Sequence, residues 1–189
     1  MQYLTLSILI FCSLQARSCG CTQVAPEETD LIAAVQKGNI ESVRACLAEG
    51  ADPNKPDEYG TPVLYLAAAY DTTGHIVKLL LDKGAAIDTK DKDGWTPLDW
   101  ADYKKNESAM KHLINKAIDL NYTKIRCQNG KNLLHCAAAL SGEESKEIVR
   151  RLLVVLDPNV QDSSGCIPLD YVVANRKDLL VQLLLHSQN

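Results

Sequence analysis

The chain has 189 residues, and 46% of them are hydrophobic, which is enough apolar surface to bury a core and excludes a disordered chain. Its formal net charge is −4, so the chain lacks the excess of positive charge that non-specific binding of nucleic acid requires. Aromatic residues make up only 5%, which argues against a base-stacking platform. Nucleic acid is therefore not expected as the main ligand.

Residues 1–18 are predicted to be a secretory signal peptide. Leu4–Leu14 is an uncharged apolar run, shorter than the roughly 20 residues that a membrane-spanning helix needs. Ala16–Ser18 supplies the small residues that cleavage before Cys19 requires. The mature chain would then be secreted, periplasmic or, if Cys19 is lipidated as in a bacterial lipoprotein, membrane-anchored, with residues 19–28 as a linker. The alternative is an N-terminal helix that packs on the domain of a cytoplasmic protein.

A repeat of 33 to 36 residues organises the rest of the chain. Glycines recur at spacings of 34, 36 and 35 residues, and a leucine follows each of them four residues later. The glycines are Gly60, Gly94, Gly130 and Gly165. The predicted repeat domain covers 29–189, and its five units are 29–59, 60–93, 94–129, 130–164 and 165–189. Such a period indicates a solenoid of stacked units.

Each unit is predicted to contain two short antiparallel helices. Ala67–Ala69 favours a helix and is too small to hold neighbouring helices apart. Ile76–Lys83 has apolar residues at helical spacing, and Gly84 is suited to end that helix. Neither helix can bury its apolar face alone, so the units must stack.

Two segments, Gly94–Ala101 (GWTPLDWA) and Gly165–Val172 (GCIPLDYV), resemble the Gly-x-Thr-Pro-Leu-His opening of an ankyrin repeat. Gly50–Asn54 and Gly84–Asp88 are similar to the Gly-Ala-Asp-Val-Asn close of that repeat. The resemblance implies an all-α repeat solenoid, a stack of helix pairs with β-hairpin fingers projecting to one side. It also implies a non-catalytic, monomeric module that binds a protein partner. In the first unit, Thr29 or Asp30 is expected to cap the opening helix.

Ankyrin repeats bind proteins through their fingertips and the exposed side of their first helices. Carried over by position, this implies binding residues Glu58, Tyr59, Tyr70, Lys92, Asp93, Trp95, Tyr103, Lys104, Gln128 and Lys131. Further candidates are Thr61, Ala69, Asn129, Leu140, Ser163, Ser164, Cys166 and Asn175. We expect the energetic centre at the aromatic residues, because Tyr and Trp are enriched at binding hot spots. Each ring alone would also fit partial packing against a neighbouring hairpin, and Trp100 is expected in the core.

The sequence carries no motif of a hydrolase, a phosphate-binding loop or a metal site, so we expect no enzyme activity, cofactor or metal. His135 stands at the histidine of the repeat opening, for which the resemblance implies a hydrogen bond that stabilises the hairpin. Asn106 and Asn121 begin N-glycosylation sequences, which matter only in a eukaryotic host.

Cysteine chemistry supplies the alternative function, a small enzyme or exported accessory protein. Cys127 follows Lys124 and Arg126 and is the candidate for a reactive thiol. Cys46 and Cys136 fall on helix positions and are expected to be buried. A disulfide between Cys127 and Cys166 on successive fingers is disfavoured, because the spacing of stacked repeats that the resemblance implies exceeds disulfide reach.

Overall fold

The structure is a computed structural model that describes residues 30–174, 181 and 184–185. The predicted signal peptide and linker lie outside these residues. In the described part, helices α2 to α9 form four antiparallel pairs, followed by α10. Their bounds are α2 Leu31–Gln36, α3 Ile40–Ala48, α4 Val63–Tyr70, α5 His75–Asp82, α6 Pro97–Tyr103, α7 Glu107–Asp119, α8 Leu133–Ala139, α9 Glu143–Leu153 and α10 Pro168–Ala174.

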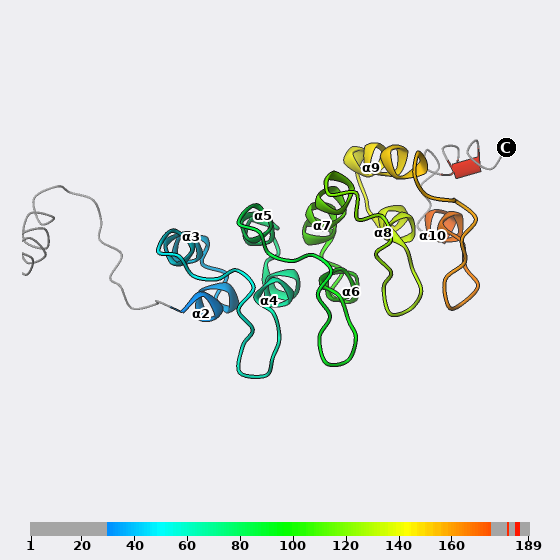
Figure 1. Cartoon of the computed structure of the whole chain (residues 1–189). Coiled ribbons are helices and arrows are strands. Elements are labelled where there is room, and N and C mark those ends of the chain that lie inside the picture. The colour runs from blue at the N-terminus through cyan, green and yellow to red at the C-terminus, as the bar shows by residue number, and fades with distance from the viewer. Residues whose placement is uncertain (1–29, 175–180, 182–183, 186–189) are drawn as a thin grey trace, which may run out of the picture.

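The pairs stack side by side into two rows (Figure 1). Helices α2, α4, α6, α8 and α10 form the inner row, and α3, α5, α7 and α9 form the outer row. Contacts run along the rows, for example from α2 to α4 to α6 and from α5 to α7 to α9. Val181, Leu184 and Leu185 are also helical. The stacked architecture confirms the predicted solenoid, while the fifth complete unit stays a prediction.

Small residues in the inner row let the helices approach closely. Ala67, Ala68, Ala101 and Ala137 are fully buried there, and the outer row fills the space between the rows with larger side chains such as Leu80. These residues belong to one continuous core along the stack. Among the described helices, none is long and apolar enough to cross a lipid bilayer.

Side-chain caps fix where several helices begin. Asp30 accepts a hydrogen bond from the N–H of Ile32, as predicted for the first helix, while Thr29 lies outside the described residues. At α6, Thr96 accepts from the N–H of Asp99, and the Asp99 carboxylate accepts from the N–H of Thr96. This reciprocal capping box satisfies two backbone donors at once and fixes the direction of α6.

Four loops project below the inner row as fingers (Figure 1). They connect each outer helix to the next inner helix, and each is numbered by the repeat whose inner helix follows it. The second finger is 49–62 before α4, the third is 83–96 before α6, the fourth is 120–132 before α8, and the fifth is 154–167 before α10. Each tip is closed by a backbone hydrogen bond across four residues, such as Asp91 N–H to Trp95 O at 2.9 Å. The predicted β-hairpins are minimal in the described residues, because their pairing consists of isolated antiparallel bridges, Pro56 with Pro62 and Arg126 with Asn132.

Candidate functional site

Three aromatic rings meet where the third finger joins α6. The Trp95 ring lies 5.3 Å from that of Trp100 and 5.6 Å from that of Tyr103, and Trp100 and Tyr103 are 6.1 Å apart. Tyr103 is 64% exposed, whereas both tryptophans are half-buried. Trp100, which was expected in the core, packs against the core but is only partly buried.

Hydrogen bonds hold the two tryptophans in place. The Trp100 indole N–H donates to Asp91 Oδ2 at 3.0 Å, and the backbone N–H of Trp95 donates to Asp91 Oδ1 at 2.9 Å. The Tyr65 hydroxyl in the preceding repeat donates to the Trp95 carbonyl at 2.7 Å. Since these bonds fix the Trp95 backbone and the Trp100 ring, the cluster is preorganised for contact with another molecule.

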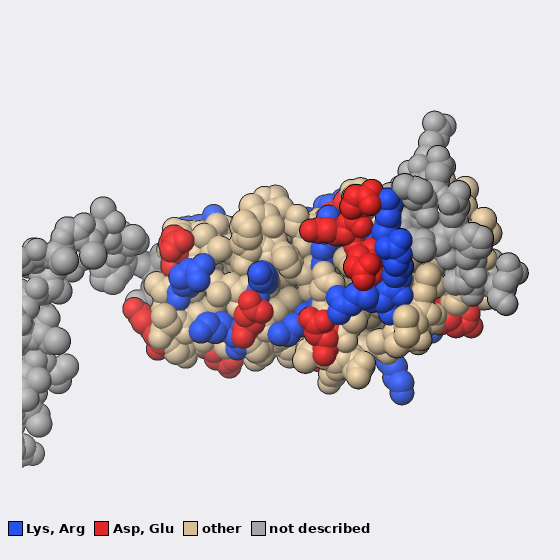
Figure 2. Space-filling model, turned by 90° about the horizontal axis from the view of Figure 1, so that it is seen from above, with Lys and Arg blue, Asp and Glu red and all other residues tan. Residues whose placement is uncertain are grey.

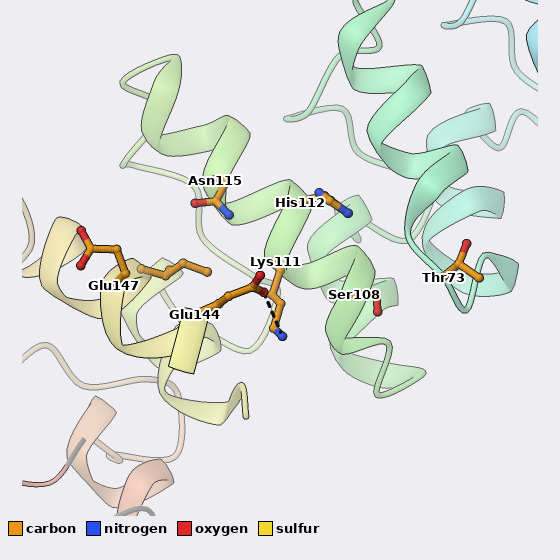
Figure 3. A pocket seen from close by; sticks show the side chains of 8 residues that line it. Thr73, Ser108, Lys111, His112, Asn115, Glu144 and Glu147 are labelled. Carbon is orange, nitrogen blue, oxygen red and sulfur yellow. Dashed lines mark ion pairs between the residues drawn. The ribbon is translucent and has the colours of Figure 1, made fainter. Parts of the chain in front are cut away.

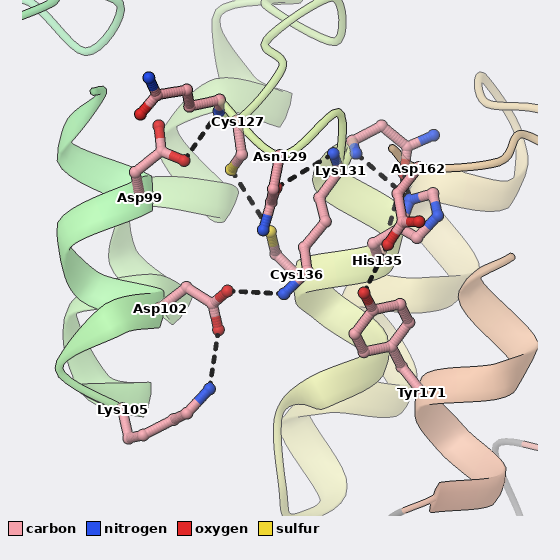
Figure 4. A network of polar contacts seen from close by, with 12 residues as sticks. Asp99, Asp102, Lys105, Cys127, Asn129, Lys131, His135, Cys136, Asp162 and Tyr171 are labelled. Atoms are coloured by element: carbon pink, nitrogen blue, oxygen red, sulfur yellow. Dashed lines mark hydrogen bonds and ion pairs between the residues drawn. The ribbon is translucent and has the colours of Figure 1, made fainter. Parts of the chain in front are cut away.

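A cavity of about 470 Å³ opens beside the cluster. It lies between α6 and the fourth finger and is lined by Trp95, Asp99, Asp102, Tyr103, Lys105, Gln128 and Asn129. The backbone N–H of Gln128 donates to Asp99 Oδ1 at 2.9 Å, and its side-chain amide donates to the Asp93 carbonyl at 3.0 Å. The first bond fixes the fourth finger against α6 (Figure 4), and the second ties it to the third finger, so the cavity has walls from two successive repeats.

Lys131, a predicted binding residue, makes a contact between repeats (Figure 4). Its side chain is only 13% exposed and donates to Asp102 Oδ2 at 2.8 Å. The ammonium also lies 4.7 Å from the centre of the Tyr171 ring, which favours a cation there. Burial alone would lower the pKa of Lys131, but the hydrogen bond and charge of Asp102 outweigh it and raise the pKa. The Lys131 ammonium is therefore bound by side chains of the two neighbouring repeats.

Most of the other predicted binding residues are exposed. They are Glu58, Tyr59, Tyr70, Lys92, Asp93, Lys104, Gln128, Asn129, Ser163 and Ser164. Thr61, Ala69 and Cys166 are half-buried. Leu140 was wrong as a surface candidate, because α8 ends at Ala139 and the Leu140 side chain is fully buried at the turn that follows. Asn175 lies outside the described residues.

In the second, third and fourth repeats, the residue at the histidine position of the repeat opening bonds to the next finger. Nδ1 of the buried His135 ring lies 3.2 Å from the backbone nitrogen and 2.7 Å from Oδ1 of Asn132, and Nε2–H donates to the Cys166 carbonyl at 3.1 Å. This confirms the hairpin-stabilising bond expected for His135. Tyr65 and Asp99 occupy the equivalent positions and bond the third and fourth fingers in the same way.

Stability should fall when the pH is lowered from 7.5 to 5.5, and His135 should contribute to that fall. Burial lowers the pKa of His135, so the unfolded chain binds more protons than the folded chain below the ordinary histidine pKa of about 6.5. The stabilising contribution is thus complete above that pKa and is lost in acid. Urea unfolding at both pH values should show a smaller difference for His135→Gln than for the wild type. An unchanged difference would contradict a neutral buried imidazole.

A second cavity of about 380 Å³ lies on the outer row, between α7 and α9 (Figure 3). Its charged groups are already paired, since Lys111 Nζ lies 3.3 Å from Glu144 Oε2. The outer face shows intermixed acidic and basic side chains over α7 and α9 (Figure 2), including the pair Arg151–Asp119 at 2.7 Å. With its charges neutralised locally, this face offers no single-sign patch.

Cys127 does not fit the reactive-thiol hypothesis. Its side chain is buried, at 4% exposure, and contact with Cys136 together with burial raises the pKa of the thiol. A thiol without access or thiolate character is a poor nucleophile. Cys46 and Cys136 are buried as predicted. Within the described residues, no group of three or more His, Cys, Asp or Glu side chains is arranged to hold a metal ion.

The two glycosylation sequences differ in their surroundings. The Asn106 amide donates to the carbonyls of Ala68 and Asp71 at 3.0 and 2.8 Å, and its Oδ1 caps α7 by accepting from Ala109. Attachment of a glycan would break these contacts. Asn121 is exposed, so of the two glycosylation sequences it is the one that a glycosylating enzyme could reach in the folded chain.

Paired helices, inner-row alanines and fingers define a helical repeat solenoid whose functional surface is formed by several repeats together. Comparison with known proteins specifies the repeat: residues 31–124 match the family described as ankyrin repeats (3 copies). The chain therefore carries ankyrin repeats, and its fold is an ankyrin-repeat solenoid. Repeats of this kind imply a protein–protein interaction module.

Individual relatives match over part of their length. The chain is 30% identical to neurogenic locus notch homolog protein 1 of Xenopus tropicalis over 122 residues, covering 65% of this chain and 5% of that protein. It is 33% identical to ankyrin repeat and SAM domain-containing protein 6 of Mus musculus over 132 residues, covering 67% of this chain and 14% of that protein. The chain thus spans a small fraction of these relatives.

Proposed function

We propose that the chain binds a protein partner through the α6 surface, defined as Trp95, Trp100, Tyr103, Gln128 and Asn129. The observation that carries this proposal is the aromatic cluster beside a cavity of about 470 Å³. A partner side chain that enters the cavity would contact preorganised rings on one side and the polar fourth finger on the other. Aromatic side chains that become buried when a partner binds often contribute most of the binding free energy.

Further exposed tyrosines extend the surface toward the N-terminal repeats. Tyr59 on the second repeat's finger is 69% exposed, and Tyr70 at the end of α4 is 57% exposed. Large apolar side chains at such exposure are enriched at interfaces. The outer row, in contrast, carries intermixed charges that pair with one another. The partner should therefore approach from the side of the fingers and inner helices, and one monomer suffices for this contact.

Tyr103→Ala is the most direct test of the α6 surface. The tyrosine is exposed, so its loss should change the free energy of unfolding by no more than about 1 kcal/mol. Loss of an interface hot spot should lower partner recovery at least tenfold, as about 1.4 kcal/mol of binding energy implies. Recovery should be measured by quantitative mass spectrometry after affinity purification from the source cells.

Tyr122→Ala is the matched control, because Tyr122 is also an exposed tyrosine, at 47%, but follows α7 outside the α6 surface. It should leave recovery unchanged. Equal recovery with Tyr103→Ala and Tyr122→Ala would exclude the α6 surface as the binding site. Unfolding of Tyr103→Ala in a melting curve would instead make the ring a structural residue.

We also propose export of the chain through cleavage before Cys19, supported by the apolar Leu4–Leu14 run and the small residues that follow it. The intact mass and N-terminal sequence of the protein from its source cells test this. A chain that starts at Cys19 is expected, and a lipid mass on Cys19 would add a membrane anchor. An uncut Met1 would overturn export and direct the partner search to the cytoplasm.

A further inference from the structure

Two positions face each other at the base of each of the last three described fingers. One lies three residues before the fingertip glycine, and the other lies six residues after it, on the inner helix. At the third finger the pair is Asp91 and Trp100, joined by the indole N–H bond at 3.0 Å. In the fifth it is Asp162 and Tyr171, joined by a hydroxyl bond at 2.5 Å. Each pair ties a finger to its own helix.

Cys127 and Cys136 occupy these two positions at the fourth finger. Their sulfur atoms are 3.8 Å apart, and both side chains are buried, at 4% and 1% exposure (Figure 4). A cysteine in place of the aspartate also removes a hydrogen-bond acceptor for backbone N–H groups at the fingertip. In the second, third and fifth fingers, Oδ1 of the equivalent aspartate accepts two backbone N–H bonds.

A thiol pair is a weak substitute for the carboxylate bond, because S–H is a weak donor and sulfur a weak acceptor. Contact with Cys136 and burial raise the pKa of the Cys127 thiol, which favours its protonated form. Side-chain movements of about 2 Å in total would bring the sulfurs from contact to bonding distance. The two cysteines stand where the third and fifth fingers have a hydrogen-bonded pair. A covalent bond between them would join finger and helix in the same place.

We propose that Cys127 and Cys136 form a disulfide that ties the fourth finger to α8. A low-molecular-weight disulfide such as oxidised glutathione is the oxidant. One cysteine, as thiolate, attacks a sulfur of the oxidant and releases one thiolate. The second cysteine then attacks the mixed disulfide and releases the other thiolate. The S–S bond forms, and two electrons and two protons pass to the oxidant, which becomes two thiols.

This inference goes beyond the proposed partner binding, and neither proposal depends on the other. It concerns the joint between finger and helix, whereas partner binding concerns the α6 surface. The buried thiols are out of reach in the folded chain, so the bond should form while the finger is still open during folding. An oxidising compartment would supply the disulfide partner.

Tryptic mapping tests the bond on the purified wild-type chain. Trypsin cuts after Arg126, Lys131 and Lys146, so the two cysteines fall in separate peptides, 127–131 and 132–146. The chain is refolded with reduced and oxidised glutathione, alkylated in denaturant and digested without reductant. We expect the two peptides linked, and released as free peptides by a phosphine reductant. Recovery of both peptides as alkylated thiols, or linkage of Cys127 to Cys166, would overturn the proposal.

Thermal unfolding provides a second readout. Refolding in reductant should lower the melting temperature of the wild type by roughly 5–10 °C, because the short loop constraint is lost. Cys127→Ala should show no such difference between oxidising and reducing conditions. Cys46→Ala, which removes another buried thiol, should keep it. A difference that persists in Cys127→Ala would assign the effect to other cysteines and reject this pair.

Discussion

Replacement of Leu80 by alanine is expected to lower the free energy of unfolding by about 2–5 kcal/mol. The Leu80 side chain is fully buried in α5, between the two helix rows. Its truncation removes apolar surface from the core and leaves a cavity that rigid neighbouring helices cannot fully close. Urea or thermal unfolding of the variant measures the loss directly.

Leu79→Ala is the matched control, since Leu79 is the preceding residue of the same helix but is only partly buried against the core. Its loss should be clearly smaller. A loss below about 1 kcal/mol for Leu80→Ala would contradict a core that runs between the rows. Equal losses for the two variants would contradict the orientation of α5.

Replacement of Gly130 by alanine is expected to cost about 2–4 kcal/mol of stability. Gly130 has a φ of 79°, a conformation that disfavours any residue with a Cβ. A Cβ at this position would lie 2.8 Å from the backbone nitrogen of Ser163 in the next finger. That nitrogen donates to the Asn129 carbonyl at 3.0 Å, so relief of the clash would weaken a contact between repeats.

Gly94→Ala separates these two effects. Gly94 is the equivalent fingertip glycine, with a φ of 82°, but a Cβ there meets open space. Only the backbone strain should appear, about 1–2 kcal/mol. Thermal unfolding of the two variants therefore measures the contact between the fourth and fifth fingers. Equal losses would show that the two fingers do not meet as described.

The fold could be predicted from the sequence because its determinants are local and repeated. Alanines that allow close helix approach, capping residues and fingertip glycines recur at one period, and stacking is then the way to bury each helix. Exposed tyrosines such as Tyr59, Tyr70 and Tyr103 could be located on the same basis. Each of these features depends only on the sequence of one unit and on its immediate neighbours.

Sequence and structure differ where contacts that form only in the folded chain decide burial. Lys131 pairs with Asp102 of the preceding repeat, and Leu140 is buried because α8 ends at Ala139. Neither can be inferred from the position within a single unit. Trp100 is half-buried because its indole N–H reaches Asp91 at the base of its own finger.

The cysteine pair, however, left a signal in the sequence. Cys127 stands three residues before a fingertip glycine, where Asp57, Asp91 and Asp162 stand in other repeats. Alignment of the repeats with one another would have marked the substitution, but the contact with Cys136 needed the folded finger base.

Site-specific photo-crosslinking tests the proposed α6 surface most directly. A photoreactive phenylalanine analogue is placed at Tyr103 or, as the control, at Tyr122, and the chain is irradiated in its source cells. We expect a discrete adduct with one partner protein from position 103 and not from position 122. Adducts from position 122 alone, or the same adduct from both, would contradict binding through the α6 surface.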